Sequence, residues 1–204
     1  NNKYFKNNII KILKKADLNI TDIIIKEKEV SKDNKVSEYN HDDDVELIHS
    51  INDNIELIHS INNKNYSLKF GQESEGTKKY YSFSGILIIL ISNFSTIVSI
   101  DELESSLHPE LFQHFLLTFL VNSKNSQLIA TSHYREILNN RDIFRDDAIW
   151  FTDKNEDSAT ELYSLADFDS SVVRDTTNVL NAYKSGKLGG VPNLGDYYIN
   201  LDEE

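Results

Sequence analysis

A short apolar stretch that ends on two adjacent acids does most to constrain the fold of this 204-residue chain. Residues 96–100, Thr-Ile-Val-Ser-Ile, are rich in β-branched side chains and too few for a stable helix, so they predict a buried strand of a parallel sheet. Asp101 and Glu102 follow directly. Because open α/β sheets bind ligands outside the carboxyl ends of their strands, the two acids predict a site at that edge.

A second strand with polar residues at its end follows after one helix. Pro109 is a favourable first helical residue, and apolar positions after it repeat at helical spacing. Residues 128–131 then predict a strand that ends two residues before His133. Strand, helix and strand in this order predict a parallel βαβ unit, so we expect His133 to lie near Asp101 and Glu102.

A strand that ends in Asp-Glu matches the Walker B pattern of P-loop nucleotide hydrolases. In that pattern the first carboxylate holds Mg²⁺ and the second orients or deprotonates the attacking water, which are the roles predicted for Asp101 and Glu102. A core strand that runs into an acidic turn would give the same short pattern. The functional interpretation therefore depends on further motifs.

One such motif is a helix whose first turn contains a glycine. Ser74 is a favourable N-cap, and apolar residues follow it at helical spacing through Leu90. Gly76 lowers helix stability relative to alanine, so we expect another group to approach the backbone closely there. The free N–H groups of this turn would attract an anion, although an ordinary capped helix fits the same residues.

Composition narrows the functional class. The 39% hydrophobic and 26% charged residues are ordinary for a globular domain. The formal net charge of −12 gives no electrostatic footprint for nucleic acid, so DNA or RNA contact would need a local patch or another subunit. The absence of cysteine excludes disulfides and thiolate metal sites, and no apolar run is long enough to span a membrane. We expect a cytoplasmic protein with no membrane partner.

Other segments predict a surrounding framework. Two ten-residue copies, at 45–54 and 55–64, indicate a local duplication within a polar insertion. The glycine-rich tail at 186–195 does not match the phosphate-loop pattern G-x-x-x-x-G-K-[ST]. Apolar spacing elsewhere predicts a lysine-rich amphipathic helix over 1–16, strands over 20–30 and 66–70, a strand pair at 148–152 and 160–165, and a last helix over 172–183.

As an ordered set, four motifs resemble the C-terminal half of ABC-type ATPases, most closely the RecF- and SMC-like bacterial ATPases of the AAA and abortive-infection type. The motifs are Ser-Glu-Gly-Thr at 74–77, Ile-Val-Ser-Ile-Asp-Glu at 97–102, Ser-Ser-Leu-His-Pro at 105–109 and Ala-Thr-Ser-His at 130–133. The resemblance covers roughly residues 66–195. It implies an α/β, P-loop NTPase-like fold, in which helices flank a parallel sheet.

The resemblance implies catalytic roles for three residues. Asp101 would serve Mg²⁺, Glu102 would serve the hydrolytic water, and His133 would be the switch that senses the γ-phosphate of ATP. These roles agree with those predicted from the strand ends.

The same resemblance implies that two of the motifs act across a dimer interface. Ser74 and Gly76 would contact the γ-phosphate of ATP bound on the opposing subunit. Ser105 to His108 would form a D-loop across the interface. The sequence Ser-Glu-Gly-Thr departs from the Leu-Ser-Gly-Gly-Gln of transporters, which argues against a transport subunit.

Walker A and the Q-loop, which lie in the N-terminal half of the family's domain, are absent from the sequence. The chain also contains no methionine, even at position 1, so we expect a fragment of a longer ATPase. Residues 1–65 would be the end of a lid region with a variable insertion, and 66–204 the C-terminal part of the ATPase domain. We expect residues 1–204 alone to bind and hydrolyse ATP poorly.

The implied cofactors are ATP and Mg²⁺. The implied partners are the missing N-terminal ATPase half, a second copy in a homodimer and an effector nuclease, within a phage-defence or DNA-repair-like system. The alternative is a non-catalytic interaction module that uses the same fold without a phosphate loop. A G-x-x-x-x-G-K-[ST] segment upstream would favour the ATPase.

Overall fold

The computed structural model describes residues 2–26, 54–92, 95–139, 143–169, 173, 178–192 and 194–196. They belong to two compact units, Asn1–His133 and Tyr134–Glu204. The predicted domain boundary between residues 65 and 66 falls inside a strand of the first unit. Among the described residues, no helix has the length and apolar character needed to span a bilayer.

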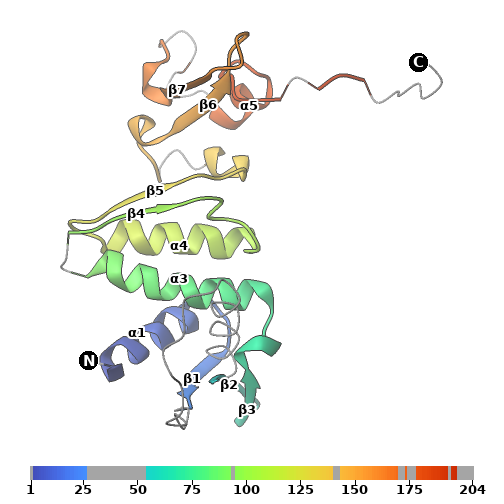
Figure 1. Ribbon diagram of the computed structural model, residues 1–204. Coiled ribbons are helices and arrows are strands. Elements are labelled where there is room, and N and C mark those ends of the chain that lie inside the picture. Colours follow the sequence, from blue (N-terminus) through green and yellow to red (C-terminus); the bar gives the residue numbers. More distant parts are fainter. Residues whose placement is uncertain are drawn as a thin grey trace, which may run out of the picture. The chain divides into compact units, whose positions relative to one another are not determined.

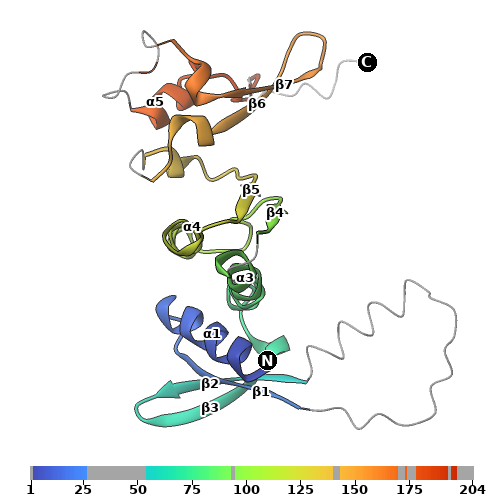
Figure 2. The same cartoon turned by 90° about the vertical axis from the view of Figure 1, so that its left-hand side faces the viewer.

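The first unit begins with a helix packed on an antiparallel sheet (Figures 1 and 2). The helix is α1 (Asn2–Lys15), and the sheet has the order β1 (Ile20–Ile25), β2 (Ile55–Ile61), β3 (Lys64–Lys69). Helix α1 points its apolar stripe inward and its lysines outward, as the spacing predicts. The small core beneath it contains Ile9, Leu13, Ile20, Ile23 and Leu57.

Strand β2 is the second copy of the duplicated segment, which the sequence analysis places in a polar insertion. It is the central strand of the sheet, paired with β1 on one side and β3 on the other. Alternating apolar residues at Ile55, Leu57 and Ile61 are the signal that could have predicted it. The first copy lies outside the described residues except for Asn54.

Two long helices and a parallel strand pair complete the first unit. Helix α3 (Glu75–Ile91) begins after Ser74, and α4 (Pro109–Asn122) begins at the predicted proline. Strands β4 (Ile97–Ile100) and β5 (Gln127–Ala130) pair in parallel, with Ile100 opposite Ala130. The two helices lie side by side in both views of the molecule, next to the strand pair (Figures 1 and 2). The predicted βαβ unit is confirmed.

The prediction that the first of these strands is buried is wrong. Ile97 is 67% exposed and Ile129, on the neighbouring strand, is 59% exposed. Exposure alternates along β4, which is the period-two pattern of a strand covered on one face. Ile97 and Ile129 lie on the same face of this sheet, and among the described residues nothing covers that face.

Helices α3 and α4 are joined by a buried polar contact. Tyr80 is fully buried, and its hydroxyl lies 2.5 Å from His114 Nδ1. Burial raises the pKa of Tyr80, whereas burial and then the charge of Lys15 lower the pKa of His114. The tyrosine therefore donates the hydrogen bond to a neutral imidazole.

The second unit is built on a hairpin. Strands β6 (Trp150–Lys154) and β7 (Thr160–Ser164) are antiparallel and confirm the predicted strand pair. Helix α5 (Val179–Lys184) overlaps the end of the predicted last helix, of which residues 172 and 174–177 lie outside the described ones. The hydrophobic core of this unit is made by Leu138, Phe151, Leu165, Val179, Leu180, Ala182 and Leu188.

The glycine-rich tail packs against one tyrosine of this hairpin and one of helix α5. Tyr163 donates its hydroxyl to the Leu188 carbonyl at 2.8 Å, and Tyr183 donates to the Gly190 carbonyl at 2.8 Å. Gly189 and Gly190 both have φ of +65°. The glycines therefore serve a tight turn against the hairpin, which agrees with the rejection of this tail as a phosphate loop.

Candidate functional site

At the carboxyl ends of β4 and β5, the side chain of one threonine forms hydrogen bonds with both predicted acids. Thr131 Oγ1 accepts a hydrogen bond from the Glu102 N–H at 2.9 Å and donates one to the Asp101 carboxylate. The Thr131 backbone extends the ladder, because its N–H donates to the Ile100 carbonyl at 3.1 Å. The sequence did not single out Thr131, although a hydroxyl directly after the strand was a usable signal.

Glu102 has an unusual backbone conformation. Its φ is +45°, in the left-handed region that costs most residues other than glycine about 1–2 kcal/mol. Its carbonyl oxygen lies 3.4 Å from the Lys79 ammonium nitrogen on α3 and accepts the Ser105 N–H at 2.9 Å. The side chain remains 56% exposed. The turn thus holds the carboxylate at the surface of the sheet edge.

His133 lies where the βαβ order predicts. Its Nε2 is 3.8 Å from Glu102 Oε1, and its side chain is 86% exposed. An acid and a histidine from two different strand ends therefore face one another across the edge of the sheet. At this separation a water molecule can contact both groups.

A third carboxylate at this edge was not predicted. Glu104 Oε1 accepts a hydrogen bond from the backbone N–H of His133 at 2.6 Å. The other oxygen, Oε2, is buried and has no hydrogen-bond partner among the described residues. The pattern Asp-Glu-Leu-Glu at 101–104 shows this acid, but nothing in the sequence indicates that it turns back toward His133.

The turn at Ser74 to Gly76 adjoins the same loop. Ser74 Oγ accepts the Thr77 N–H at 3.1 Å and thereby caps α3. A Cβ added at Gly76 would lie 3.1 Å from the Ser106 carbonyl oxygen. The expectation that a group approaches the backbone at Gly76 is confirmed, and within this chain that group is Ser106.

The two remaining predicted residues behave differently from one another. Ser105 is in the turn held to the Glu102 carbonyl. His108 precedes α4 and its side chain, 72% exposed, pairs with Glu110. The structure therefore brings Ser74, Gly76, Ser105 and His133 around the loop after β4, and directs the His108 ring toward the start of α4.

The residues at this edge could supply one carboxylate ligand to a magnesium ion. Among the described residues, no three His, Asp or Glu side chains lie close enough together to hold a metal ion. Mg²⁺ is commonly held by one or two carboxylates with water and substrate phosphates, so Asp101 suits it. The 204 residues contain no G-x-x-x-x-G-K-[ST] segment. They therefore lack the phosphate-binding loop whose backbone N–H groups surround the phosphates of ATP.

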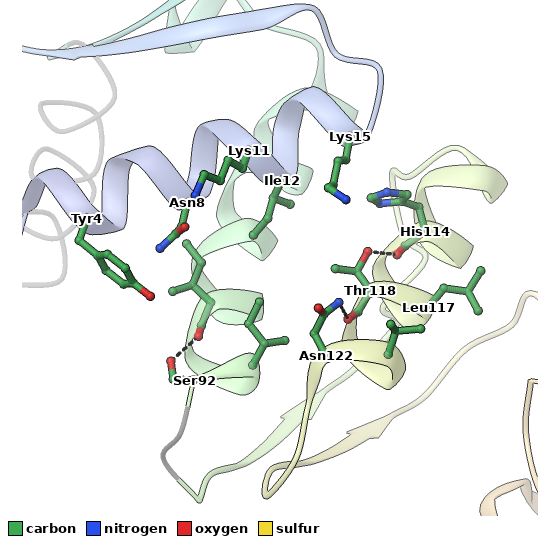
Figure 3. A pocket seen from close by; sticks show the side chains of 13 residues that line it. Tyr4, Asn8, Lys11, Ile12, Lys15, Ser92, His114, Leu117, Thr118 and Asn122 are labelled. Carbon is green, nitrogen blue, oxygen red and sulfur yellow. Dashed lines mark hydrogen bonds between the residues drawn. The ribbon is translucent and has the colours of Figure 1, made fainter.

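A separate groove of about 570 Å³ lies among α1, α3 and α4 (Figure 3). Lys11 and Lys15 extend from α1 along it. Thr118 and Asn122 donate their hydrogen bonds back to carbonyls of their own helix. None of the 13 described residues that line the groove is acidic, and none belongs to the β4–β5 edge.

Comparison with protein families identifies the domain type. Residues 2–139 match the family described as "AAA domain, putative AbiEii toxin, Type IV TA system". The chain belongs to this AAA domain family. The match contains α1 and all seven residues predicted for the site. The part of the chain that belongs to the family therefore includes the acids at the strand ends.

A solved structure supports the same type of fold. The AAA domain is similar to a chain from work described as "Structural biochemistry of ATP-driven dimerization and DNA stimulated activation of SMC ATPases". The TM-score is 0.54 at 11% identity, over 90% of this chain and 91% of the other. None of the curated proteins matches the sequence. Family and fold together make this an ATPase-type domain with a P-loop NTPase-like α/β fold.

Proposed function

We propose that this chain is the C-terminal part of an ABC-type ATPase domain that hydrolyses ATP in a nucleotide-held dimer. The observation that carries the proposal is the pairing of Glu102 Oε1 with His133 Nε2, 3.8 Å apart, beyond the ends of two parallel strands. Asp101 would bind Mg²⁺, which neutralises phosphate charge when present. Glu102 would orient and deprotonate water, and His133 would donate to the γ-phosphate.

The proposal includes a second polypeptide segment that supplies the phosphate cradle. The uncovered face of the β4–β5 pair supports it, because parallel sheets are normally covered on both faces. Ile97 and Ile129 are the exposed apolar residues that an added half-domain would cover. The 204-residue chain alone is then expected to bind ATP with a dissociation constant of about 1 mM or weaker.

Other observations support the proposed dimer and the proposed biological role. Ser74 and Gly76 adjoin the loop of Ser105 and Ser106, so one continuous surface could meet ATP on a neighbouring copy. The similar SMC chain comes from work on ATP-driven dimerization. The family description names a toxin–antitoxin system. We propose a role in phage defence on that basis, and the effector nuclease stays a partner implied by the sequence resemblance alone.

The test is Glu102→Gln in a protein that also contains the phosphate-loop half. Gln keeps the shape of the side chain but is no base, so hydrolysis should slow by about 10²-fold or more while ATP binding persists. Single-turnover hydrolysis and size-exclusion chromatography should show slow turnover and an accumulated dimer. Glu136→Gln, at an exposed carboxylate paired with Lys184, is the matched control. Unchanged turnover in Glu102→Gln would remove the residue from the mechanism.

The groove of α1, α3 and α4 favours a second candidate, a module that binds a partner protein. Its lysines and the apolar Leu117 and Val121, which are 37% and 80% exposed, suit an acidic amphipathic helix. Lys11→Glu combined with Lys15→Glu should then abolish protection of cells against phage, while Glu102→Gln should leave it intact. The reverse pattern would favour the ATPase.

A further inference from the structure

Glu104 differs from the two acids before it in where its carboxylate lies. Asp101 and Glu102 are exposed, whereas Glu104 is half-buried and turns toward the segment after β5. Its backbone carbonyl accepts the Leu107 N–H at 2.9 Å, so the loop itself is folded back at this residue. The side chain is therefore not placed to contact a nucleotide in the same way as its neighbours.

The balance of forces on Glu104 favours its charged form. Burial alone would raise the pKa of this carboxyl, but hydrogen bonds from the His133 N–H, its own N–H and the Ser132 side chain outweigh burial and lower the pKa. The group is therefore an ionised acceptor at neutral pH. A hydrogen bond to an ionised acceptor is about twice as strong as one between neutral groups.

The hydrogen bond from the His133 N–H to Glu104 lies beyond the end of β5, where the backbone bonds of the sheet have stopped. The last backbone bonds between the two segments both involve Thr131, two residues before His133: its N–H donates to the Ile100 carbonyl, and its carbonyl accepts the Leu103 N–H, each at 3.1 Å. The exposed pairing of His133 with Glu102 cannot replace them, since ion pairs between exposed side chains contribute little to stability. Of the contacts described here, the Glu104 bond is the one that fixes the His133 backbone.

We propose that Glu104 is a positioning residue, which holds the His133 backbone so that its imidazole faces Glu102 across the sheet edge. This inference rests on the proposed function, in which Glu102 and His133 act together on ATP hydrolysis. Removing the carboxylate would let His133 move away from the place where both groups meet one phosphate. A displacement of this kind costs turnover more than substrate affinity.

The first test needs no nucleotide and uses the 204-residue chain. Histidine-selective ¹⁵N labelling gives amide signals for the six histidines, and His133→Gln assigns the relevant one. The His133 amide proton should lie downfield and should titrate below the ordinary glutamate pKa of 4.5, because the pKa of Glu104 is lowered. Glu104→Gln should abolish this titration, and the control Glu136→Gln should preserve it. A His133 amide that does not respond to Glu104 would overturn the inference.

The second test separates turnover from binding in the protein with the phosphate-loop half. Glu104→Ala should lower kcat by about 10- to 100-fold and leave the KM for ATP within about twofold. Glu104→Gln, which keeps an acceptor oxygen without the charge, should recover part of the loss. Wild-type turnover in Glu104→Ala would overturn the positioning role.

The two tests also distinguish this inference from the proposed function. If the wild-type protein hydrolyses no ATP but the His133 amide signal still responds to Glu104, the proposed ATPase function is refuted, and with it the catalytic purpose of the contact. If the wild-type protein is active and Glu104→Ala has the same turnover, only this inference is refuted.

Discussion

The loop after β4 and the tail after α5 both contain left-handed residues, but different residue types occupy them. In the loop, Glu102 and Ser106 have φ of +45° and +61°. In the tail, the left-handed positions are glycines, and Gly189 lies against Tyr163. Glycine in the tail is explained by packing. In the loop, residues with side chains occupy the strained positions, an observation that agrees with the catalytic role proposed for Glu102.

The largest effect that would test this contrast is expected from Gly189→Ala. The new Cβ would lie 2.2 Å from the Tyr163 hydroxyl and 2.7 Å from Asp153 Oδ2, at φ of +65°. Clash and backbone strain together should lower the free energy of unfolding by about 2–4 kcal/mol. Urea denaturation followed by fluorescence of Trp150, the single tryptophan, reports on this unit.

The matched control is Gly186→Ala. Its φ is +76° and no atom lies within 4 Å of the added Cβ, so only the backbone cost of about 1–2 kcal/mol remains. Equal losses in the two variants would contradict the packing explanation of the tail.

In the loop we expect the opposite sign. Glu102→Gly should raise the free energy of unfolding of the first unit by about 1 kcal/mol, because glycine adopts φ of +45° without strain. Thermal denaturation followed by circular dichroism measures the change. Asp101→Gly is the control, since Asp101 has no positive φ and loses its bond from Thr131, so it should be destabilised. A destabilised Glu102→Gly would mean that the strain is absent.

The smallest effect concerns Thr131. Thr131→Val removes the hydroxyl between Asp101 and the Glu102 N–H, and should cost about 0.5 kcal/mol, the low end for a hydrogen bond, because water can partly replace it at this exposed position. Thr131→Ser keeps the hydroxyl and should lose less. Chemical denaturation of the two variants side by side measures the difference, and equal stability would show that the bridge contributes little.

The residues at the strand ends could be predicted from the sequence, whereas the tertiary contacts around them could not. Strand, helix and strand with Asp101, Glu102 and His133 at the ends followed from local patterns, because residue spacing determines each element and βαβ units have one common geometry. Glu104 and Lys79 could not be predicted in the same way. Their contacts depend on how a turn folds back and how α3 packs on it, which are tertiary properties without a local signature.

Other differences between prediction and structure also have physical causes. Strand β4 was predicted to be buried because its residues are apolar, but burial depends on the strands and helices around it. The strand in the duplicated segment was not predicted because its flanks are polar, although Ile55, Leu57 and Ile61 alternate as in a strand.

The open β4–β5 pair also has a consequence for how this protein behaves in solution. Each strand has an edge that pairs with no other strand among the described residues, and such an edge is a template for strands of other molecules. Repulsion between copies, each with a formal net charge of −12, opposes that pairing at low salt. Added salt shortens the range of this repulsion to about 3 Å at 1 M. Self-association should therefore grow as ionic strength rises, opposite to the behaviour of proteins that associate through complementary charges.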